Sequence, residues 1–245
     1  MRANGLMGSF YHISEWVMRF LVTNLLWFIF NLPIVYLAVH LIIVENMSEL
    51  VMVTITIAVF MPFIFIPATV AMFAVTRKWV MKEIDIPIIR SFWSYYKESY
   101  LRSMLGGLIL DVIWIIYVLD YYYFMVLNSE SYSSTLLFFL SILFLIVFAF
   151  LVAFTFNFIS YTVHIHERLF KTLKDTLIIT IGSPLISLSI SGVNVFIVYI
   201  SFSVFTFLIP FFMGSLIAFI SFIFFHLIYL KVTSLQKEND NEWQS

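Results

Sequence analysis

Residues 176–230 read TLIITIGSPLISLSISGVNVFIVYISFSVFTFLIPFFMGSLIAFISFIFFHLIYL, which is 55 consecutive residues without Asp, Glu, Lys or Arg. A helix rises about 1.5 Å per residue, so about 20 apolar residues cross a hydrocarbon core about 30 Å thick. The stretch is therefore too long for one membrane span and fits two spans joined by a turn. We place the turn at residues 208–214, because Pro210 removes a backbone donor and Gly214 relaxes the backbone.

Four further apolar stretches reach the length of a span, which gives an all-α polytopic membrane protein with six transmembrane helices. The predicted spans cover residues 17–44, 51–75, 104–124, 135–163, 184–208 and 211–231. The first is long enough to cross the bilayer, so we interpret it as a retained span and not as a signal peptide. Residues 1–232 thus form a single integral membrane domain, and we expect the polar tail 233–245 to be disordered.

The composition supports this class and excludes others. Apolar residues make up 62% of the chain and charged residues 11%, against roughly 45–50% and about 25% in ordinary soluble domains. A net charge of -1 gives no support for nucleic-acid binding, so no nucleic-acid partner is expected. The chain has no Cys, which excludes disulfides, thiol catalysis and thiolate metal sites.

The cations predict the orientation of the six spans. All 13 Lys and Arg residues lie before span one, near its start, between spans two and three, between spans four and five, or at and after the end of span six. The alternate connections contain none. Because loops rich in Lys and Arg stay on the cytosolic side, we expect both termini to be cytosolic.

Two of the cation-bearing connections have the pattern of amphipathic helices. Residues 87–102 and 167–178 each place apolar side chains at helical spacing on one face and cations on the other, which is typical of a helix that lies in the membrane interface. A constant shift of 77 residues superposes the two segments, with Trp93 on Phe170 and Tyr100 on Leu177. This register suggests a threefold internal repeat of one interfacial helix plus one transmembrane hairpin, which we take as a hypothesis.

Several short motifs resemble the YesL-like family of bacterial integral membrane proteins. The stretches concerned are Phe10-Tyr11, Glu15-Trp16, Asn24 to Trp27, Pro67 to Val75, Arg77-Lys78-Trp79 and Phe92-Trp93. The most specific is the Pro-Ala-Thr-x-Ala run that leads into Arg-Lys-Trp. The resemblance implies a multi-pass protein of the bacterial cytoplasmic membrane whose relatives accompany carbohydrate-uptake systems. It implies no reaction and transfers no catalytic residue.

Asp111 is the most informative polar residue within a predicted span. A charged carboxylate in the middle of a membrane helix costs about 2.5–3.5 kcal/mol of insertion free energy, so its presence calls for a structural or functional explanation. Ser103, Gly107 and Asp111 share one face at intervals of four residues. Small residues there let a neighbouring helix approach, which would place Asp111 in the bundle interior. Contact with a cation, a proton or a sugar hydroxyl, and a purely structural carboxyl group, both remain open.

Uncharged polar residues form further stripes at helical spacing. Together with Asp111 they define a candidate intramembrane polar site: Asn24, Asn31, Asn157, Ser187, Ser191 and Asn194. Such stripes usually bond one helix to another, and a solute path is the alternative.

No catalytic, cofactor-binding or metal site is predicted. His164 and His166 have metal-binding side chains, but residues two apart on a helix point in different directions. No phosphate-binding glycine loop and no nucleophile arrangement is present. A membrane-embedded enzyme that uses the His164 cluster is a third and weaker alternative.

The hypothesis that these observations favour is a non-enzymatic accessory or sensory protein of a bacterial carbohydrate-uptake system. The alternative is a small-solute transporter or the substrate-capturing subunit of an importer. Expected partners are the lipid bilayer and either permease subunits or a sugar-like solute.

Overall fold

The computed structural model describes residues 6–127 and 132–242, with side chains from 11–127 and 132–234. Arg2 and part of the predicted connection between spans three and four lie outside the described residues. The described residues contain helices and no strand. In chain order the elements are α1 (Leu6–Phe30), α2 (Leu32–Ile43), α3 (Met47–Phe60), η1 (Met61–Phe65), α4 (Ile66–Val80), α5 (Ile88–Tyr122), η2 (Tyr123–Leu127), α6 (Ser134–His164), α7 (Leu169–Gly182), α8 (Pro184–Ser203), η4 (Ile209–Met213) and α9 (Gly214–Glu242). The three η segments are π-helical and continue the helices beside them.

Six helical segments are long and apolar enough to cross a membrane, as the sequence predicts. They are Tyr11–Phe30, Met47–Val80, Ile88–Leu127, Ser134–His164, Pro184–Ser203 and Ile209–Ser234. The chain is a multi-pass membrane protein. Many of its apolar side chains lie on the outside of the protein. The accessible surface is 15289 Å², against roughly 11,000 Å² for a compact soluble monomer of this mass.

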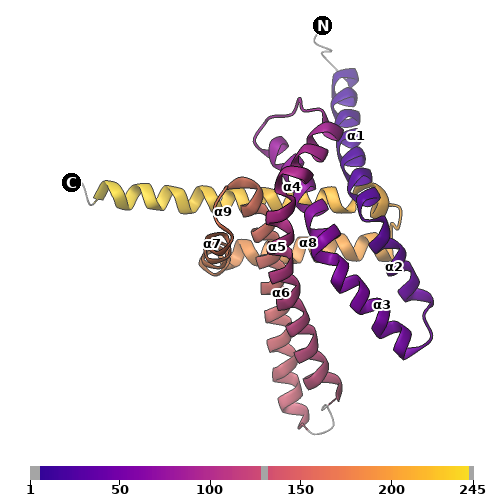
Figure 1. Ribbon diagram of the computed structural model, residues 1–245. Helices are drawn as coiled ribbons and strands as arrows, with labels where there is room; N and C mark the ends of the chain where they lie inside the picture. Colours follow the sequence, from indigo (N-terminus) through magenta and orange to yellow (C-terminus); the bar gives the residue numbers. More distant parts are fainter. Residues whose placement is uncertain (1–5, 128–131, 243–245) are drawn as a thin grey trace.

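The six spans form three helical hairpins that splay apart (Figure 1). The second helices of the hairpins, α4, α6 and α9, contact one another. Each also packs against the next hairpin: α4 on α5, α6 on α7 and α8, and α9 with η4 on α1. This cyclic order is the one that threefold packing requires, while the internal repeat itself stays a prediction.

Prolines divide the first two spans. The predicted span 17–44 is interrupted at Asn31, and α2 begins directly afterwards with Pro33 in its first turn. Proline has no N–H to bond to the preceding turn, so the helix breaks there. In the second span Pro62 opens the π-helical segment η1, which joins α3 to α4 without a break in the chain of helices.

The reversal between the last two spans lies earlier than predicted. We expected it at residues 208–214, but α8 ends at Ser203 and η4 begins at Ile209, so the turn occupies residues 204–208. Pro210 is in the first turn of the last helix, where the missing N–H has no intrahelical partner to lose. The prediction treated this proline as a turn residue, whereas it starts a helix.

The two amphipathic segments have different structures. Residues 88–102 are not a separate helix, because they continue into the third span as the single helix α5. No Gly or Pro precedes Gly106 in that helix, and Gly106 itself packs closely against Phe158 of α6. The second segment is the separate helix α7, which ends at Gly182 before the Ser183-Pro184 break.

The predicted disordered tail is also wrong for residues 233–242, because α9 continues to Glu242 and projects from the bundle (Figure 1).

Helix α4 forms the centre of the core. Its buried residues occupy every face of the helix and are Ile66, Pro67, Ala68, Thr69, Val70, Ala71, Met72, Phe73, Val75, Thr76 and Trp79. Helices α1, α5, α6 and α9 all contact it. The Pro-Ala-Thr-x-Ala motif is thus a packing motif, since its small residues allow neighbouring helices to approach α4 closely.

Helix α5 crosses its neighbours at Gly106 and Gly107. A Cβ added at Gly106 would lie 2.6 Å from Cζ of Phe158 on α6, and one at Gly107 would lie 3.1 Å from Cα of Pro62 in η1. Both glycines are buried. The pair therefore fixes how closely α5 packs against α6 on one side and η1 on the other.

The connection between α4 and α5 is held by α1. Arg19, which is buried, donates hydrogen bonds to the backbone carbonyl of Ile84 and to Oε1 of Glu15. Trp16 and Phe20 of α1 pack beside it on Trp79. The basic ends of α4 and α5 are thereby placed next to each other, which positions the polar cavity described below.

We predict that Gly107→Ala lowers the thermal stability of the detergent-solubilised protein. The new methyl group would press on the backbone of Pro62, and overpacking of this kind costs about 1–3 kcal/mol. Gly192→Ala on α8 is the matched control, because a Cβ there meets nothing within 4 Å. It should leave the melting temperature unchanged or slightly raised. Equal melting temperatures for the two variants would contradict the close crossing.

Candidate functional site

Asp111 lies in a groove between the first hairpin and α5. The groove has a volume of about 630 Å³ and is lined by Thr54, Ile55, Ile57, Ala58, Val59, Met61, Pro62, Phe63, Leu108, Asp111, Trp114, Ile115, Val118 and Leu119. Many of these side chains, such as Ile55, Val59 and Leu119, are exposed on the apolar outside of the bundle. The groove therefore opens toward lipid, and Asp111 is the only charged residue in its lining.

The carboxylate of Asp111 has no protein partner among the described residues. No hydrogen bond or ion pair reaches it, although its side chain is half-buried. A carboxylate in an apolar environment without a partner carries a desolvation cost that nothing in the described chain offsets. Asp111 is thus available to a group from outside the chain.

The prediction that Asp111 lies in the bundle interior is wrong, although the contact behind it is present. Ser103 and Gly107 on the same face are buried, and η1 approaches Gly107 closely. One turn further on, the first hairpin diverges from α5 and leaves the groove. Helical spacing identifies the face but does not show where two helices separate.

Asn24 and Asn31 form hydrogen bonds at the ends of helices. Asn24 accepts a hydrogen bond from the backbone N–H of Ser215 at 3.0 Å and donates one to the carbonyl of Ile209 at 3.1 Å. It thereby holds the π-helical start of the last span against α1. Asn31 donates to the carbonyl of Trp27 at 2.8 Å, at the break between α1 and α2.

Asn157 and Ser187 join three helices. Nδ2 of Asn157 on α6 donates to Oγ1 of Thr180 on α7 at 3.1 Å and to Oγ of Ser187 on α8 at 3.5 Å. Ser187 in turn donates to the carbonyl of Thr180 at 3.1 Å. The network closes the break between α7 and α8 over the surface of α6.

Ser191 and Asn194 join α8 to two different neighbours. Ser191 donates to the carbonyl of Ala149 on α6 at 2.5 Å, and Asn194 donates to Oγ of Ser221 on α9 at 2.7 Å. None of the uncharged candidates lines the groove at Asp111. The seven predicted residues therefore do not form one site: five bond one helix to another, Asn31 bonds within the α1–α2 junction, and Asp111 lies apart from them.

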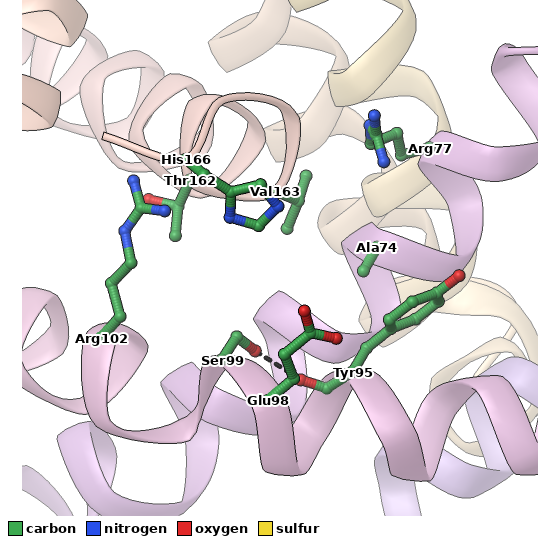
Figure 2. A pocket seen from close by; sticks show the side chains of 9 residues that line it. All are labelled: Ala74, Arg77, Tyr95, Glu98, Ser99, Arg102, Thr162, Val163 and His166. Atoms are coloured by element: carbon green, nitrogen blue, oxygen red, sulfur yellow. Dashed lines mark hydrogen bonds between the residues drawn. The ribbon is translucent and has the colours of Figure 1, made fainter. Parts of the chain in front are cut away.

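A second cavity, of about 290 Å³, lies at the basic ends of α4, α5 and α6 (Figure 2). Most of its lining residues are polar or charged: Ala74, Arg77, Tyr95, Glu98, Ser99, Arg102, Thr162, Val163 and His166. Figure 2 shows Arg77 and Arg102 on opposite sides of the cavity, with the ring of His166 between them and Glu98 on the facing wall. We call it the arginine cavity.

The two arginines are held by neutral groups. Nε of Arg77 donates to Nδ1 of His164 at 3.3 Å, and Nη2 of Arg102 donates to the carbonyl of Ile165 and to Oγ1 of Thr172, each at 3.0 Å. No carboxylate of the described residues lies within 4 Å of either guanidinium.

The nearby carboxylate of Glu167 is occupied elsewhere. It accepts a hydrogen bond from Nζ of Lys171 at 2.6 Å, and this bond is the main cause that lowers the pKa of Glu167 below its ordinary value. The same bond raises the pKa of Lys171. Both groups stay charged near neutral pH and neutralise each other, so Glu167 is already paired beside the arginine cavity.

His164 is part of an aromatic cluster and has no metal-binding arrangement. Its ring lies 4.6 Å from the ring of Tyr229 and 5.8 Å from that of His226, measured between centroids. Within the described ranges, no group of three His, Cys, Asp or Glu side chains could hold a metal ion. His166 points instead into the arginine cavity (Figure 2).

Sequence reasoning missed the arginine cavity because it used the cations only to assign orientation. Arg77 ends one apolar span and Arg102 precedes the next, which is a pattern that many membrane proteins show. It also placed residues 167–178 in the membrane interface on the basis of their apolar face, and it did not predict the buried face of α7, which contains Thr172, Thr176 and Thr180. Phe170 and Ile181 are exposed on the outside.

A family described as "Protein of unknown function, DUF624" matches residues 20–121. YesL of Bacillus subtilis (strain 168) is 27% identical over 219 residues, which cover 89% of this chain and 86% of YesL. The predicted resemblance to the YesL-like family is confirmed.

Two other proteins of Bacillus subtilis (strain 168) match parts of the chain. YteU is 33% identical over 120 residues, 49% of this chain and 43% of YteU. YesV is 40% identical over 58 residues, 24% of this chain and 28% of YesV. This YesL-like chain thus spans less than half the length of YteU. No solved structure matches. The segment that matches the family contains the whole lining of the groove at Asp111.

We predict that Asp111→Leu preserves or raises the melting temperature in detergent, whereas Asn157→Leu lowers it. Leucine at position 111 removes a carboxylate that has no partner, while leucine at 157 removes the hydrogen bonds to Thr180 and Ser187. Loss of a buried hydrogen-bonding partner costs about 1–3 kcal/mol. Thermal unfolding followed by Trp fluorescence measures both variants. A large loss of stability in Asp111→Leu would show that the carboxylate is structural.

Proposed function

We propose that this protein is a non-enzymatic accessory or sensory component of a bacterial carbohydrate-uptake system, and that it binds a transmembrane helix of a permease subunit in the groove at Asp111. The observation that carries the proposal is an unpartnered carboxylate in a groove that faces lipid. The link to carbohydrate uptake comes from the resemblance to the YesL-like family.

The shape and chemistry of the groove support a helix as the occupant. Its walls are aliphatic and aromatic side chains from α3, η1 and α5, which suit the apolar surface of another membrane helix. One Lys, Arg, Ser, Thr or Asn on that helix would donate to Asp111. The bond would offset the cost of the carboxylate in the apolar groove.

Orientation in the cytoplasmic membrane is part of the proposal. The described cations lie in the middle of α1, at the junction of α4 with α5, on α7 and late in α9. The hairpin turn at 44–46 and the turn at 204–208 contain no Lys or Arg. The positive-inside rule then places both termini and the arginine cavity on the cytosolic side.

A solute path through the membrane has less support. Buried Asn and Ser side chains of α1, α6 and α8 are bonded to other helices, so they are not arranged along one channel. The groove has a single charged group among apolar walls, which offers a sugar-like solute few hydrogen bonds. Transport therefore remains the alternative function, and Asp111 would be its working residue.

Photo-crosslinking in living cells tests the proposal. A benzophenone amino acid in place of Leu108, which lines the groove, should form an adduct with a permease subunit. The same amino acid in place of Phe196, which is exposed on α8 outside the groove, is the matched control and should not. Asp111→Leu should abolish the adduct from position 108, because the donor on the partner loses its acceptor.

Other outcomes would contradict the proposal. Equal adducts from positions 108 and 196 would show nonspecific contact. An adduct that persists in Asp111→Leu would show that the carboxylate does not recognise the partner. If Asp111→Asn stays folded but abolishes solute uptake by the protein itself, the transporter reading replaces this one.

A further inference from the structure

We propose that the arginine cavity binds a small anion that carries a phosphate group. Binding at this cavity is independent of the groove at Asp111, since the two share no lining residue. The proposal rests on three observations: two guanidiniums without carboxylate partners, buried polar atoms without partners in the lining, and a volume that holds a small ligand.

The guanidiniums provide the charge. Arg77 and Arg102 reach the cavity from α4 and α5, and each uses only part of its donors on His164, Ile165 and Thr172. A guanidinium has five N–H donors in a planar fork that matches the oxygens of a phosphate. The donors not used within the protein are therefore available to an oxyanion between the two side chains.

Two atoms in the lining lack a partner although they are buried. Nε of Arg102 and Oγ1 of Thr162 are enclosed and make no hydrogen bond among the described residues. Thr162 is only 4% exposed. A buried polar atom without a partner costs about 1–3 kcal/mol. Both atoms are enclosed in this conformation, so an oxyanion would contact them only after the side chains of Arg102 and Thr162 rotate toward the cavity.

A purely structural role explains only part of this arrangement. Helix α6 ends at His164, and cations beside the negative end of a helix stabilise it. Arg102 does so through the carbonyl of Ile165. That role needs neither a cavity of about 290 Å³ nor a second arginine on its far side. It also leaves Oγ1 of Thr162 without a partner.

Glu98 provides a distinctive test of the proposal. It is exposed on the wall of the cavity and has no protein partner among the described residues. Its negative charge should oppose an anionic ligand. A conservative removal of that charge should thus strengthen binding, an outcome that no structural role of Glu98 predicts.

Thermal unfolding of the full chain in detergent, titrated with inorganic phosphate at constant ionic strength, is the test. We expect a saturable rise in melting temperature for the wild type, a Kd lower by about tenfold for Glu98→Gln, and loss of the rise for Arg102→Gln. Lys97→Gln is the matched control: it neutralises a charge one residue away that does not line the cavity, and it should leave the Kd close to the wild-type value.

The phosphate group could belong to a soluble molecule or to a lipid headgroup. Nanodiscs of phosphatidylcholine with and without phosphatidic acid separate the two sources. A higher melting temperature and weaker phosphate binding with phosphatidic acid would identify a headgroup, and no difference would identify a soluble anion; both support the proposal. The proposal would be overturned if phosphate gave the wild type no saturable rise in melting temperature. It would also be overturned if Glu98→Gln and Lys97→Gln bound phosphate with equal Kd. If Arg102→Gln does not fold, the comparison of Glu98→Gln with Lys97→Gln decides alone.

Discussion

Helix α4 requires uncharged side chains, several of them small, from Ile66 to Thr76, because other helices of the protein enclose it on every side. Its small residues bring α5, α6 and α9 close, and Gly106 and Gly107 allow α5 to cross at that distance. The first and second hairpins meet at their basic ends and diverge toward their turns (Figure 1), whereas the third also contacts α1 through η4 beside its turn. The groove at Asp111 is one result of that divergence. The arginine cavity lies at the opposite, converging end.

Helix α5 connects the two candidate sites. Asp111 in the groove and Arg102 in the arginine cavity belong to this one continuous helix, whereas the other walls differ: α3 and η1 for the groove, and α4 with the end of α6 for the cavity. On the two proposals together, a permease helix in the groove and a phosphate-bearing anion in the cavity both contact α5. Such shared contacts give a physical route by which one occupant would alter the affinity for the other, which is the property that a sensory subunit needs.

The length of the apolar runs was enough to predict six spans, because no soluble fold hides a 55-residue stretch such as 176–230. Local spacing also identified the close contact at Gly107. It could not place Asp111, whose surroundings depend on where two hairpins separate, nor Pro210, which starts a helix instead of a turn. The arginine cavity depends on three segments that meet only in the folded chain. The residue spacing within any one of these segments therefore does not predict the cavity.

The orientation of the chain decides whether the arginine cavity faces the cytosol, and it can be measured directly. The protein has no Cys, so Ser48→Cys and Lys97→Cys each introduce a single thiol at an exposed position. Ser48 lies at the start of α3 beside the first hairpin turn, and Lys97 lies in the basic part of α5. An impermeant thiol reagent applied to intact cells should label position 48, and it should label position 97 only after the cells are opened. Labelling of position 97 in intact cells would contradict the account.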